Sequence, residues 1–351
     1  MNVGGTARYI GRLAEALPNQ GIDTALVIGH VQGSEVEDPI VETLSFHRIE
    51  HLGRRINPLE DLRARHELRA VIRSYDPDLV HTHTFKAGAL IRSLNLDIPL
   101  VHTFHGHLFD DPDFVGRKAT VIEFIERQLA PRTTRIVTVG EVVGQDLLKR
   151  GIGKPGQFLS IPPGVDALDL PSRHDARQQL RLPEDSLVVA WVARVTEVKG
   201  PQRVLALAES FPDTTFLMAG GGNLLADMQH QAPSNLHVLG WMPTALVYAA
   251  CDIALSTSFN EGMPVSLIEA QLAGLPVVAN DVGSVREVVQ HEVTGFVGEN
   301  SDLKGNLETM LQNNSLRERM GLVAQQRARQ TFSPQRMVNT HSALYREILQ
   351  A

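Results

Sequence analysis

Residues 259–283 read FNEGMPVSLIEAQLAGLPVVANDVG, and this stretch decides the fold. One apolar run, 253–255, comes just before it, and a second, 276–279, lies inside it; both have the character of buried strands. The residues between them suit a helix that begins near Pro264, because proline in the first helical turn has no N–H to leave unpaired. A strand, a helix and a second strand at this spacing predict an α/β sheet.

The same alternation of strands and helices extends over most of the chain. The predicted strands are β-branched or apolar on both faces, as a parallel sheet requires. They lie at residues 79–81, 100–104, 135–139, 188–192, 216–219, 237–239, 253–255 and 276–279. The predicted fold class is therefore α/β, with doubly wound Rossmann-like sheets whose ligands bind beyond the carboxyl ends of the strands.

The chain of 351 residues is about twice the usual length of one domain, so two domains are expected. The predicted joint at 161–173, IPPGVDALDLPSR, is rich in proline, and a new series of strands follows it. We therefore predict an N-terminal domain over 1–165, a C-terminal domain over 166–332 and a final helical segment over 333–351. Gly4 and Gly5 lead into a helix without a preceding strand, so the first domain is expected to be one strand short.

Composition and charge exclude several classes of protein. The net charge is −7 and the isoelectric point is near 6.1, which argues against a nucleic-acid-binding protein. No apolar run approaches the ~20 residues that span a bilayer, and the first twelve residues do not resemble a signal peptide. The single cysteine, Cys251, lies in an apolar segment and is expected to be buried and inert. These features predict a cytoplasmic protein.

Two glutamates mark the most informative segment. Glu261 falls in the loop before the predicted helix, and Glu269 falls roughly 7.5 Å beyond Pro264 at ~1.5 Å per residue. The free N–H groups at the helix start favour an anion such as a diphosphate, and Gly262 permits close approach of a ligand. Glu261 is then placed to bind a hexose and Glu269 a ribose. The alternative is two solvated glutamates beside an ordinary helix.

Two cations follow another predicted strand. Arg194 and Lys199 lie between the strand at 188–192 and a helix that starts at Pro201, at the carboxyl edge of the sheet. Two cations there could hold a diphosphate leaving group. Taken alone, ordinary surface cations are the simpler interpretation. The three glycines at 220–222 permit either close approach of a ligand or a tight turn.

Histidines follow two neighbouring strands and are predicted to cluster. They are His81, His83, His102, His105 and His107. Zinc binding is one interpretation, because His-x-His on a strand can ligate zinc. No acidic or cysteine partner stands at a ligand spacing, so a site of neutral imidazoles is favoured, with His105 pointing to the ligand. We therefore expect no metal.

Taken together, these elements resemble the GT-B glycosyltransferases of family 4, the glycosyl transferases group 1. The most specific element is the pair Glu261 and Glu269 with seven residues between them. Further support comes from Gly4–Gly5, from 103–106 (TFHG), from 161–166 (IPPGVD), and from Arg194 with Lys199 and Gly200. The resemblance covers nearly the whole chain and departs from the family at Ala193, where a glycine is common.

The resemblance implies two domains facing a cleft and a retaining, metal-independent transfer of a hexose-type sugar from a nucleoside diphosphate sugar, UDP or GDP. No cofactor is implied, because the nucleotide sugar is a substrate. Arg194 and Lys199 would neutralise the departing diphosphate, and Glu269 would hold the ribose. Glu261 would hold the hexose together with the backbone of the next three residues, Gly262, Met263 and Pro264.

The same resemblance assigns roles to the N-terminal domain. His105 would contact the hexose from the opposite domain, and Gly4 and Gly5 would let the first loop approach the phosphates and the acceptor. The C-terminal helix would cross back to brace this domain. The acceptor is left open, with lipid-linked acceptors and roles in glycan, glycolipid or polysaccharide synthesis among the family's possibilities.

Three alternatives stay open on the sequence. The chain could be a non-hydrolysing sugar-nucleotide epimerase, or an inactive truncated protein that binds sugar nucleotides; donor turnover separates these from a transferase. The basic stretch 54–73 could make peripheral contact with anionic lipid. Because Glu60, Asp61 and Glu67 are interleaved with its arginines, a solvated face is the competing interpretation.

Overall fold

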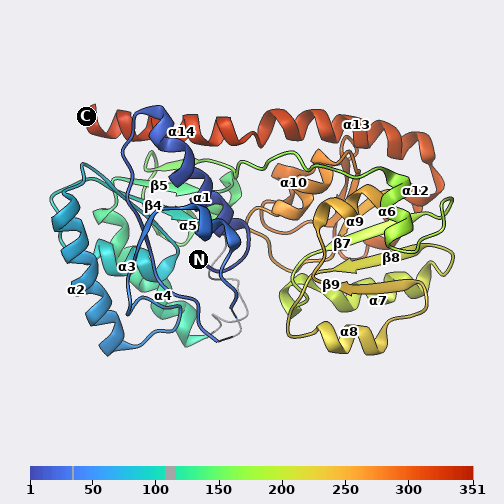
Figure 1. Cartoon of the computed structure of the whole chain (residues 1–351), viewed down its shortest axis with the longest axis horizontal. Helices are drawn as coiled ribbons and strands as arrows, with labels where there is room; N and C mark the ends of the chain where they lie inside the picture. Colours follow the sequence, from blue (N-terminus) through green and yellow to red (C-terminus); the bar gives the residue numbers. More distant parts are fainter. Residues whose placement is uncertain (34, 107–108, 110–115, 351) are drawn as a thin grey trace. The chain divides into compact units, whose positions relative to one another are not determined.

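The computed structural model describes residues 1–33, 35–106, 109 and 116–350. The chain divides into two compact units (Figure 1). Unit 1 comprises Met1–Gly164 and Pro334–Ala351, and unit 2 comprises Val165–Ser333. The C-terminal helix α14 (Pro334–Gln350) thus belongs to the unit that contains the N-terminus.

Unit 2 is built on one six-stranded parallel sheet in the order β12-β11-β10-β7-β8-β9. The strands are β7 (Val188–Val192), β8 (Thr215–Ala219), β9 (Leu236–Gly240), β10 (Ile253–Ser256), β11 (Val277–Asn280) and β12 (Gly295–Gly298). From β7 the chain winds outward in one direction through β8 and β9, and from β10 in the other. The strand order therefore reverses between β7 and β10, which is where ligands bind in open α/β sheets.

Helices enclose this sheet, so its strands are apolar on both faces. Trp191, Phe216, Met218 and Val278 are almost fully buried in its core. The helical elements are α6 (Arg173–Gln179), η6 (Glu197–Lys199), α7 (Pro201–Ser210), α8 (Leu225–Gln231), α9 (Thr244–Ala250), α10 (Val265–Leu272), α11 (Val285–Val288), α12 (Leu303–Gln312) and α13 (Asn314–Thr331).

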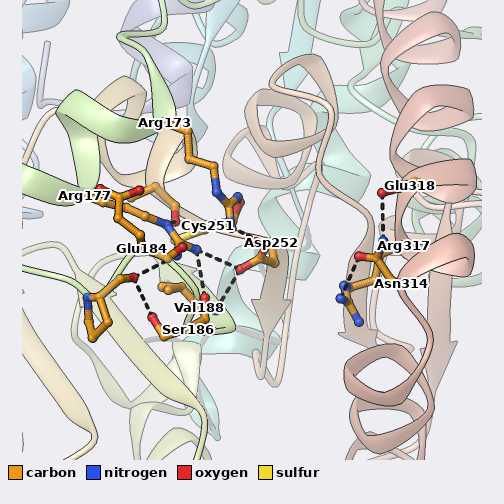
Figure 2. A network of polar contacts seen from close by, with 12 residues as sticks. Arg173, Arg177, Glu184, Ser186, Val188, Cys251, Asp252, Asn314, Arg317 and Glu318 are labelled. Carbon is orange, nitrogen blue, oxygen red and sulfur yellow. Dashed lines mark hydrogen bonds and ion pairs between the residues drawn. The ribbon is translucent and has the colours of Figure 1, made fainter.

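A buried arginine ties the amino-terminal end of this sheet together (Figure 2). Arg177 of α6 donates to the carbonyl oxygens of Ala250 at 3.1 Å and Ser186 at 2.9 Å, and to the carboxylate of Asp252 at 3.1 Å. The same carboxylate accepts a hydrogen bond from the backbone N–H of Val188 at 2.9 Å. Cys251 beside it is buried, as predicted, and burial raises the pKa of its thiol.

Unit 1 carries two separate parallel sheets. One is the pair β1 (Leu26–Ile28) and β2 (Phe46–Arg48), and the other has the order β3-β4-β5-β6. The strands of the second sheet are β3 (Val80–His83), β4 (Leu100–Phe104), β5 (Arg135–Thr138) and β6 (Phe158–Ser160). Asn2 forms an isolated antiparallel bridge with Glu37, and the helix predicted after the first glycines is α1 (Gly5–Ala16).

The other helices of unit 1 are η1 (Leu17–Gln20), η2 (Pro39–Thr43), α2 (Pro58–Tyr75), α3 (Phe85–Arg92), α4 (Arg117–Leu129), η5 (Ala130–Arg132) and α5 (Glu141–Lys149). Helix α3 packs against both α2 and α4, and α1 packs against α14 (Figure 1). A fully buried ion pair joins α3 to α4, with Arg92 nitrogens 2.8 Å and 2.7 Å from the Glu126 oxygens. Among the helices that the structure describes, none combines the length and the apolarity that crossing a membrane requires.

Candidate functional site

The loops that leave β7 and β10 lie side by side at the point where the strand order of unit 2 reverses. The β7 loop carries Arg194 and Lys199, and the β10 loop carries Glu261. The position of these loops is a direct consequence of parallel pairing, because the carboxyl ends of paired parallel strands meet at one edge of the sheet. The predicted cations and the first predicted glutamate therefore belong to adjacent loops.

Lys199 and Glu261 form a close ion pair. The Lys199 Nζ atom lies 2.6 Å from Oε1 of Glu261, and the Ser258 hydroxyl donates to the same oxygen at 2.7 Å. The two charged side chains are only 18% and 10% exposed. The sequence predicted both residues for the site; it did not predict that they pair with each other or that Ser258 takes part.

The loop that carries Lys199 is fixed by its neighbour. The Thr257 hydroxyl lies 3.0 Å and 2.8 Å from the carbonyl oxygens of Lys199 and Gly200, and it accepts a hydrogen bond from the Trp191 indole at 2.9 Å. Gly200 has φ +64°, and a Cβ there would come within 2.4 Å of the Thr257 carbonyl oxygen. Only glycine fits this position without strain, so the chain can hold Lys199 close to the β10 loop.

Helix α10 places the second glutamate. The helix begins at Val265, and Pro264 is its N-cap residue, so the prediction that Pro264 lies in the first turn is wrong by one position. Glu269 lies in the middle of α10 and is 4% exposed, while Glu261 is 9% exposed. Burial, and then the charge of Glu269, raise the pKa of the neighbouring Tyr248 well above its usual value. The alternative of two solvated glutamates is therefore excluded.

Arg194 lies on the same loop but differs from Lys199. It is exposed, and its guanidinium makes no hydrogen bond or ion pair with any residue in the described part of the chain. The glycines at 220–222 explain how this loop lies on the sheet: a Cβ at Gly220 would be 1.9 Å from the Ala193 carbonyl oxygen, and one at Gly222 would be 2.2 Å from that of Val195. These glycines serve close packing of the chain against itself.

Three buried oxygens near these loops lack partners among the residues that the structure describes. They are Oγ1 of Thr196, Oδ1 of Asn280 and Oγ of Ser284. The Asn280 amide donates to the Ser258 carbonyl at 3.2 Å, and the Ser284 N–H donates to that of Glu261 at 3.3 Å. Buried polar atoms normally have a partner, so such oxygens beside a strand-end loop point to a polar ligand or water. The sequence signal that was missed is the polar segment after β11.

The histidines of unit 1 cluster as predicted, and hydrogen bonds join them to each other and to nearby threonines. The Nδ1 atom of His83 lies 3.0 Å from Nε2 of His105. The Nε2 atom of His81 lies 2.6 Å from the Thr103 hydroxyl. His102 faces elsewhere and lies 2.8 Å from the Thr82 hydroxyl. His107 lies outside the described residues.

Two helices complete this cluster with residues that the sequence did not single out. The Tyr9 hydroxyl of α1 lies 3.2 Å from Nε2 of His341 in α14, and its ring meets that of His105 edge-on at 5.0 Å. The Tyr345 hydroxyl, also from α14, lies 2.6 Å from Nδ1 of His81. The strand ends, α1 and α14 thus share one aromatic and imidazole cluster.

The imidazoles of this cluster are neutral. Burial lowers the pKa of His105 to about 3 and that of His341 to about 4. Burial, and then the neighbouring histidines or Arg92, also hold the pKa values of His81, His83 and His102 well below the usual range. Within the described ranges, no group of three His, Cys, Asp or Glu residues is placed to hold a metal ion.

The glycines of the first loop lie apart from these contacts. Gly4 has φ +144° and donates its N–H to the Asp38 carboxylate at 3.3 Å, and Gly5 begins α1. Their role toward phosphates and an acceptor stays a prediction.

Two family models match the chain. The model described as "Glycosyl transferase 4-like domain" matches residues 4–164, and "Glycosyl transferases group 1" matches residues 172–327. A UDP-Gal:alpha-D-GlcNAc-diphosphoundecaprenol alpha-1,3-galactosyltransferase of Escherichia coli is 26% identical over 85% of this chain and 81% of its own. A D-inositol 3-phosphate glycosyltransferase of Corynebacterium glutamicum (strain R) is 31% identical over 78% of this chain and 72% of its own.

Solved structures show the same fold. The sucrose-phosphate synthase of Thermosynechococcus elongatus has a TM-score of 0.86 at 20% identity, over 99% of this chain and 94% of that one. Anabaena Alr3699/HepE in complex with UDP and glucose has a TM-score of 0.81 at 20% identity, over 98% and 96%. The parallel α/β units and these likenesses define a GT-B protein.

The chain belongs to the glycosyl transferases group 1, the GT-B enzymes of family 4. It is a glycosyltransferase that uses a nucleotide sugar.

Proposed function

We propose that this enzyme transfers a hexose from a nucleoside diphosphate sugar to an acceptor hydroxyl, with retention of anomeric configuration and without a metal ion. The observation that carries the proposal is the pair of Lys199 and Glu261, 2.6 Å apart, where the strand order of unit 2 reverses. Helix α10 starts at Val265, four residues after Glu261, so backbone N–H groups and a lysine are available to one anion. This combination suits a sugar joined to a diphosphate.

Each charged residue of the site binds a different part of the donor. Lys199 and Arg194 bind the diphosphate and stabilise the negative charge that develops on it as the glycosidic bond breaks. Glu261, whose orientation Lys199 and Ser258 fix, accepts hydrogen bonds from hexose hydroxyls, with the backbone of Gly262–Pro264 beside it. The buried Glu269 accepts from the ribose hydroxyls.

The transfer itself needs no covalent nucleophile. The anomeric bond to the phosphate oxygen breaks, the acceptor oxygen bonds to the anomeric carbon on the same face, and the departing phosphate takes the acceptor proton. Catalysis then rests on positioning and on stabilisation of the leaving group. Because lysine, arginine and a helix start supply the positive charge, we propose that no metal is required. The neutral His105 would hydrogen-bond a hexose hydroxyl.

The relatives suggest which substrates to test first. One relative is named for a UDP-sugar and an undecaprenol-linked acceptor, and one solved neighbour holds UDP-glucose. We therefore propose UDP before GDP as the donor nucleotide and a lipid-linked sugar as the first acceptor class.

Donor binding is tested by thermal stabilisation with UDP-, GDP- and ADP-sugars in the presence of EDTA. We expect one nucleotide to raise the melting temperature of the wild type and to lose its effect in Glu269→Ala. The matched control is Glu197→Ala, which removes an exposed carboxylate from η6 and should keep the effect. A folded wild type that no donor stabilises, or stabilisation that persists in Glu269→Ala, would contradict the donor site.

Turnover separates the remaining alternatives. Transfer with an α-donor should give an α-linked product, as the anomeric coupling in a proton NMR spectrum reports. A β-linked product would refute retention, and activity restored only by added Mg²⁺ would refute metal independence. Isomerisation of the donor would indicate an epimerase, and donor binding without any conversion would indicate a silent sugar-nucleotide-binding protein.

A further inference from the structure

His83 and His105 of unit 1 form a direct hydrogen bond between two imidazoles. Strands β3 and β4 pair in parallel, with His83 opposite Thr103, so the carboxyl ends of both strands bring the two histidines together. The Nδ1 atom of His83 lies 3.0 Å from Nε2 of His105. Within the described residues, this is the one hydrogen bond of either ring. The Nδ1 atom of His105 is therefore left for a ligand or for water.

Aromatic neighbours restrict the rotation of both rings. The Tyr9 ring meets the His105 ring edge-on, with centroids 5.0 Å apart, and its centroid lies 6.1 Å from that of His83. The His81 ring lies 4.2 Å from the His83 ring, with an angle of 32° between their planes. The Tyr9 hydroxyl is itself anchored on the Ile161 carbonyl oxygen at 3.2 Å. The contact between His83 and His105 is thus part of a packed cluster.

The backbone directly after His83 is strained. Thr84, which leads from β3 into α3, has φ +68° and ψ 154°. A positive φ is rare for a β-branched residue, because its side chain then crowds the backbone. Strained positions of this kind cluster at functional sites, where the surrounding structure holds them in place. The strain at Thr84 therefore supports a functional role for the end of β3.

The two rings share a single proton between their facing nitrogens. Both imidazoles are neutral, because burial lowers the pKa of His105 to about 3 and that of His83 well below its usual range. A neutral imidazole has one N–H donor and one acceptor nitrogen, and its hydrogen bonds set its tautomer. If Nε2–H of His105 donates to Nδ1 of His83, both rings carry their proton on Nε2. This is the more stable tautomer of a free histidine side chain, whereas the opposite bond needs the less stable tautomer on both rings.

We propose that His83 is a positioning residue for His105: it fixes the Nε2–H tautomer, so that Nδ1 of His105 accepts a hydrogen bond from a hydroxyl of the donor hexose. The identity of this ligand rests on the proposed function. The tautomer does not, because it is a property of the ligand-free protein. In this role His83 acts through His105 and does not contact the sugar.

A fixed tautomer at His105 has a consequence for specificity. An acceptor nitrogen binds a sugar group that carries a proton, such as a hydroxyl, and not the same group after methylation or replacement by hydrogen. A donor N–H at this position would instead bind the oxygen of a hydroxyl and of a methoxy group alike. Because a polar group that loses its partner is costly, the tautomer of one histidine discriminates between substituted hexoses.

The tautomer is tested by ¹⁵N NMR of the ligand-free full chain, labelled with ¹⁵N-histidine, at pH 7.5. The nitrogen shifts of a neutral imidazole report which nitrogen carries the proton, and the signals of the pair are assigned by their loss in His83→Ala and His105→Ala. We expect Nε2–H on both rings in the wild type, and a mixture of both tautomers at His105 in His83→Ala. A wild-type His105 with its proton on Nδ1, or one that keeps a single tautomer without His83, would overturn the proposal.

The contact with the hexose is tested by calorimetric titration of the full chain with UDP-glucose and, separately, with UDP, which lacks the sugar. His83→Ala should weaken UDP-glucose binding about three- to tenfold, the equivalent of one hydrogen bond, and should leave UDP binding unchanged. His83→Asn should restore UDP-glucose binding, because its amide oxygen replaces Nδ1 as the acceptor. The matched control is His81→Ala, which removes the neighbouring imidazole of β3 and should keep the wild-type ratio of the two affinities.

The outcomes separate a positioning role from a structural one. Equal losses for UDP and UDP-glucose in His83→Ala, or the same selective loss in His81→Ala, would assign His83 to the packing of the cluster and overturn the proposal. Full UDP-glucose affinity in folded His83→Ala would overturn it as well. A wild type that binds neither probe would contradict the donor site and the contact with the hexose, and the NMR experiment decides the tautomer in either case.

Discussion

The two units place opposite kinds of chemistry at the carboxyl ends of their strands. In unit 2 these ends carry charge: Lys199 pairs with Glu261 at 2.6 Å, and the exposed Arg194 lies on the same loop as Lys199. In unit 1 the corresponding ends carry imidazoles that burial keeps neutral, with the pKa of His105 lowered to about 3. Under the proposed function, the charged edge of unit 2 binds the diphosphate, and the neutral edge of unit 1 exchanges uncharged hydrogen bonds with sugar hydroxyls.

The interiors of the two units also differ, in how each satisfies the charge of a buried arginine. Unit 1 buries a complete ion pair, Arg92 with Glu126, and both side chains are fully buried. Unit 2 buries Arg177 mainly against carbonyl oxygens, with the partly exposed Asp252 as its one acidic partner among the described residues (Figure 2). The buried arginine of unit 1 thus relies on a buried carboxylate, whereas that of unit 2 relies chiefly on backbone carbonyl oxygens.

The largest expected effect comes from breaking the buried pair of unit 1. Glu126→Ala should lower the free energy of unfolding by about 3–5 kcal/mol, because it leaves the Arg92 guanidinium buried without its counter-charge. Urea denaturation, followed by circular dichroism, measures this change. Glu123→Ala on the same helix removes the partly exposed ion pairs with Arg127 and Arg150 and should cost about 1 kcal/mol in total. Equal costs for the two variants would show that burial does not set the strength of these pairs.

Asp252→Asn is the corresponding test in unit 2, because it removes the acidic partner of the buried Arg177. Arg177 would keep its carbonyl partners, so this change should cost only about 1.5–3 kcal/mol, the range for a hydrogen bond to a charged group. A cost as large as that of Glu126→Ala would contradict the view that carbonyl oxygens satisfy this arginine.

The next prediction concerns the positive charge of Lys199 at the carboxyl ends of the strands of unit 2. If Lys199 stabilises the departing diphosphate as proposed, Lys199→Met should reduce the turnover rate by about 10²–10³-fold, because it removes that charged donor. Steady-state kinetics should show the loss chiefly in kcat. The control is Lys304→Met, which removes an exposed lysine from α12 and should leave both constants unchanged. A loss confined to KM would assign Lys199 to ground-state binding alone.

The central strands of both units could be predicted from sequence because parallel strands covered on both faces are continuous apolar runs. The strands that were missed are short and lie at edges or in a two-stranded pair. Examples are β2 (Phe46–Arg48), with two exposed residues, and β12 (Gly295–Gly298), which pairs only with β11. Such segments bury one side or less, so their composition does not distinguish them from loops.

The site was predictable where a motif follows a strand, and not where a partner comes from far along the chain. Lys199 and Glu261 both follow strands, so topology placed them together. Tyr9 and His341 meet across 332 residues, and neither follows a strand of the sheet. Ser258 was missed because a lone serine carries no signal until the orientation of Glu261 is known.

The smallest effect concerns the neutral histidines of unit 1 and depends on pH. Their pKa values in the folded protein lie below the ~6.5 of an unfolded histidine, so the unfolded chain binds more protons in acid. Their contribution to stability is complete above pH ~6.5 and is lost as pH falls toward about 4 for His341 and about 3 for His105. Each histidine should add a slope of up to about 1.4 kcal/mol per pH unit.

Urea denaturation between pH 7.5 and 5 measures this slope. His341→Gln should make it shallower, because the glutamine cannot take up a proton in the unfolded state, while its amide can still meet the Tyr9 hydroxyl that lies 3.2 Å from the imidazole. His230→Gln, at an exposed position of α8, is the control and should leave the slope unchanged. If stability were equally pH-dependent in wild type and His341→Gln, the imidazole at 341 would be free to ionise in the folded protein. The contrast between a neutral and a charged strand edge would then fail at α14, the helix that contributes His341 to the cluster.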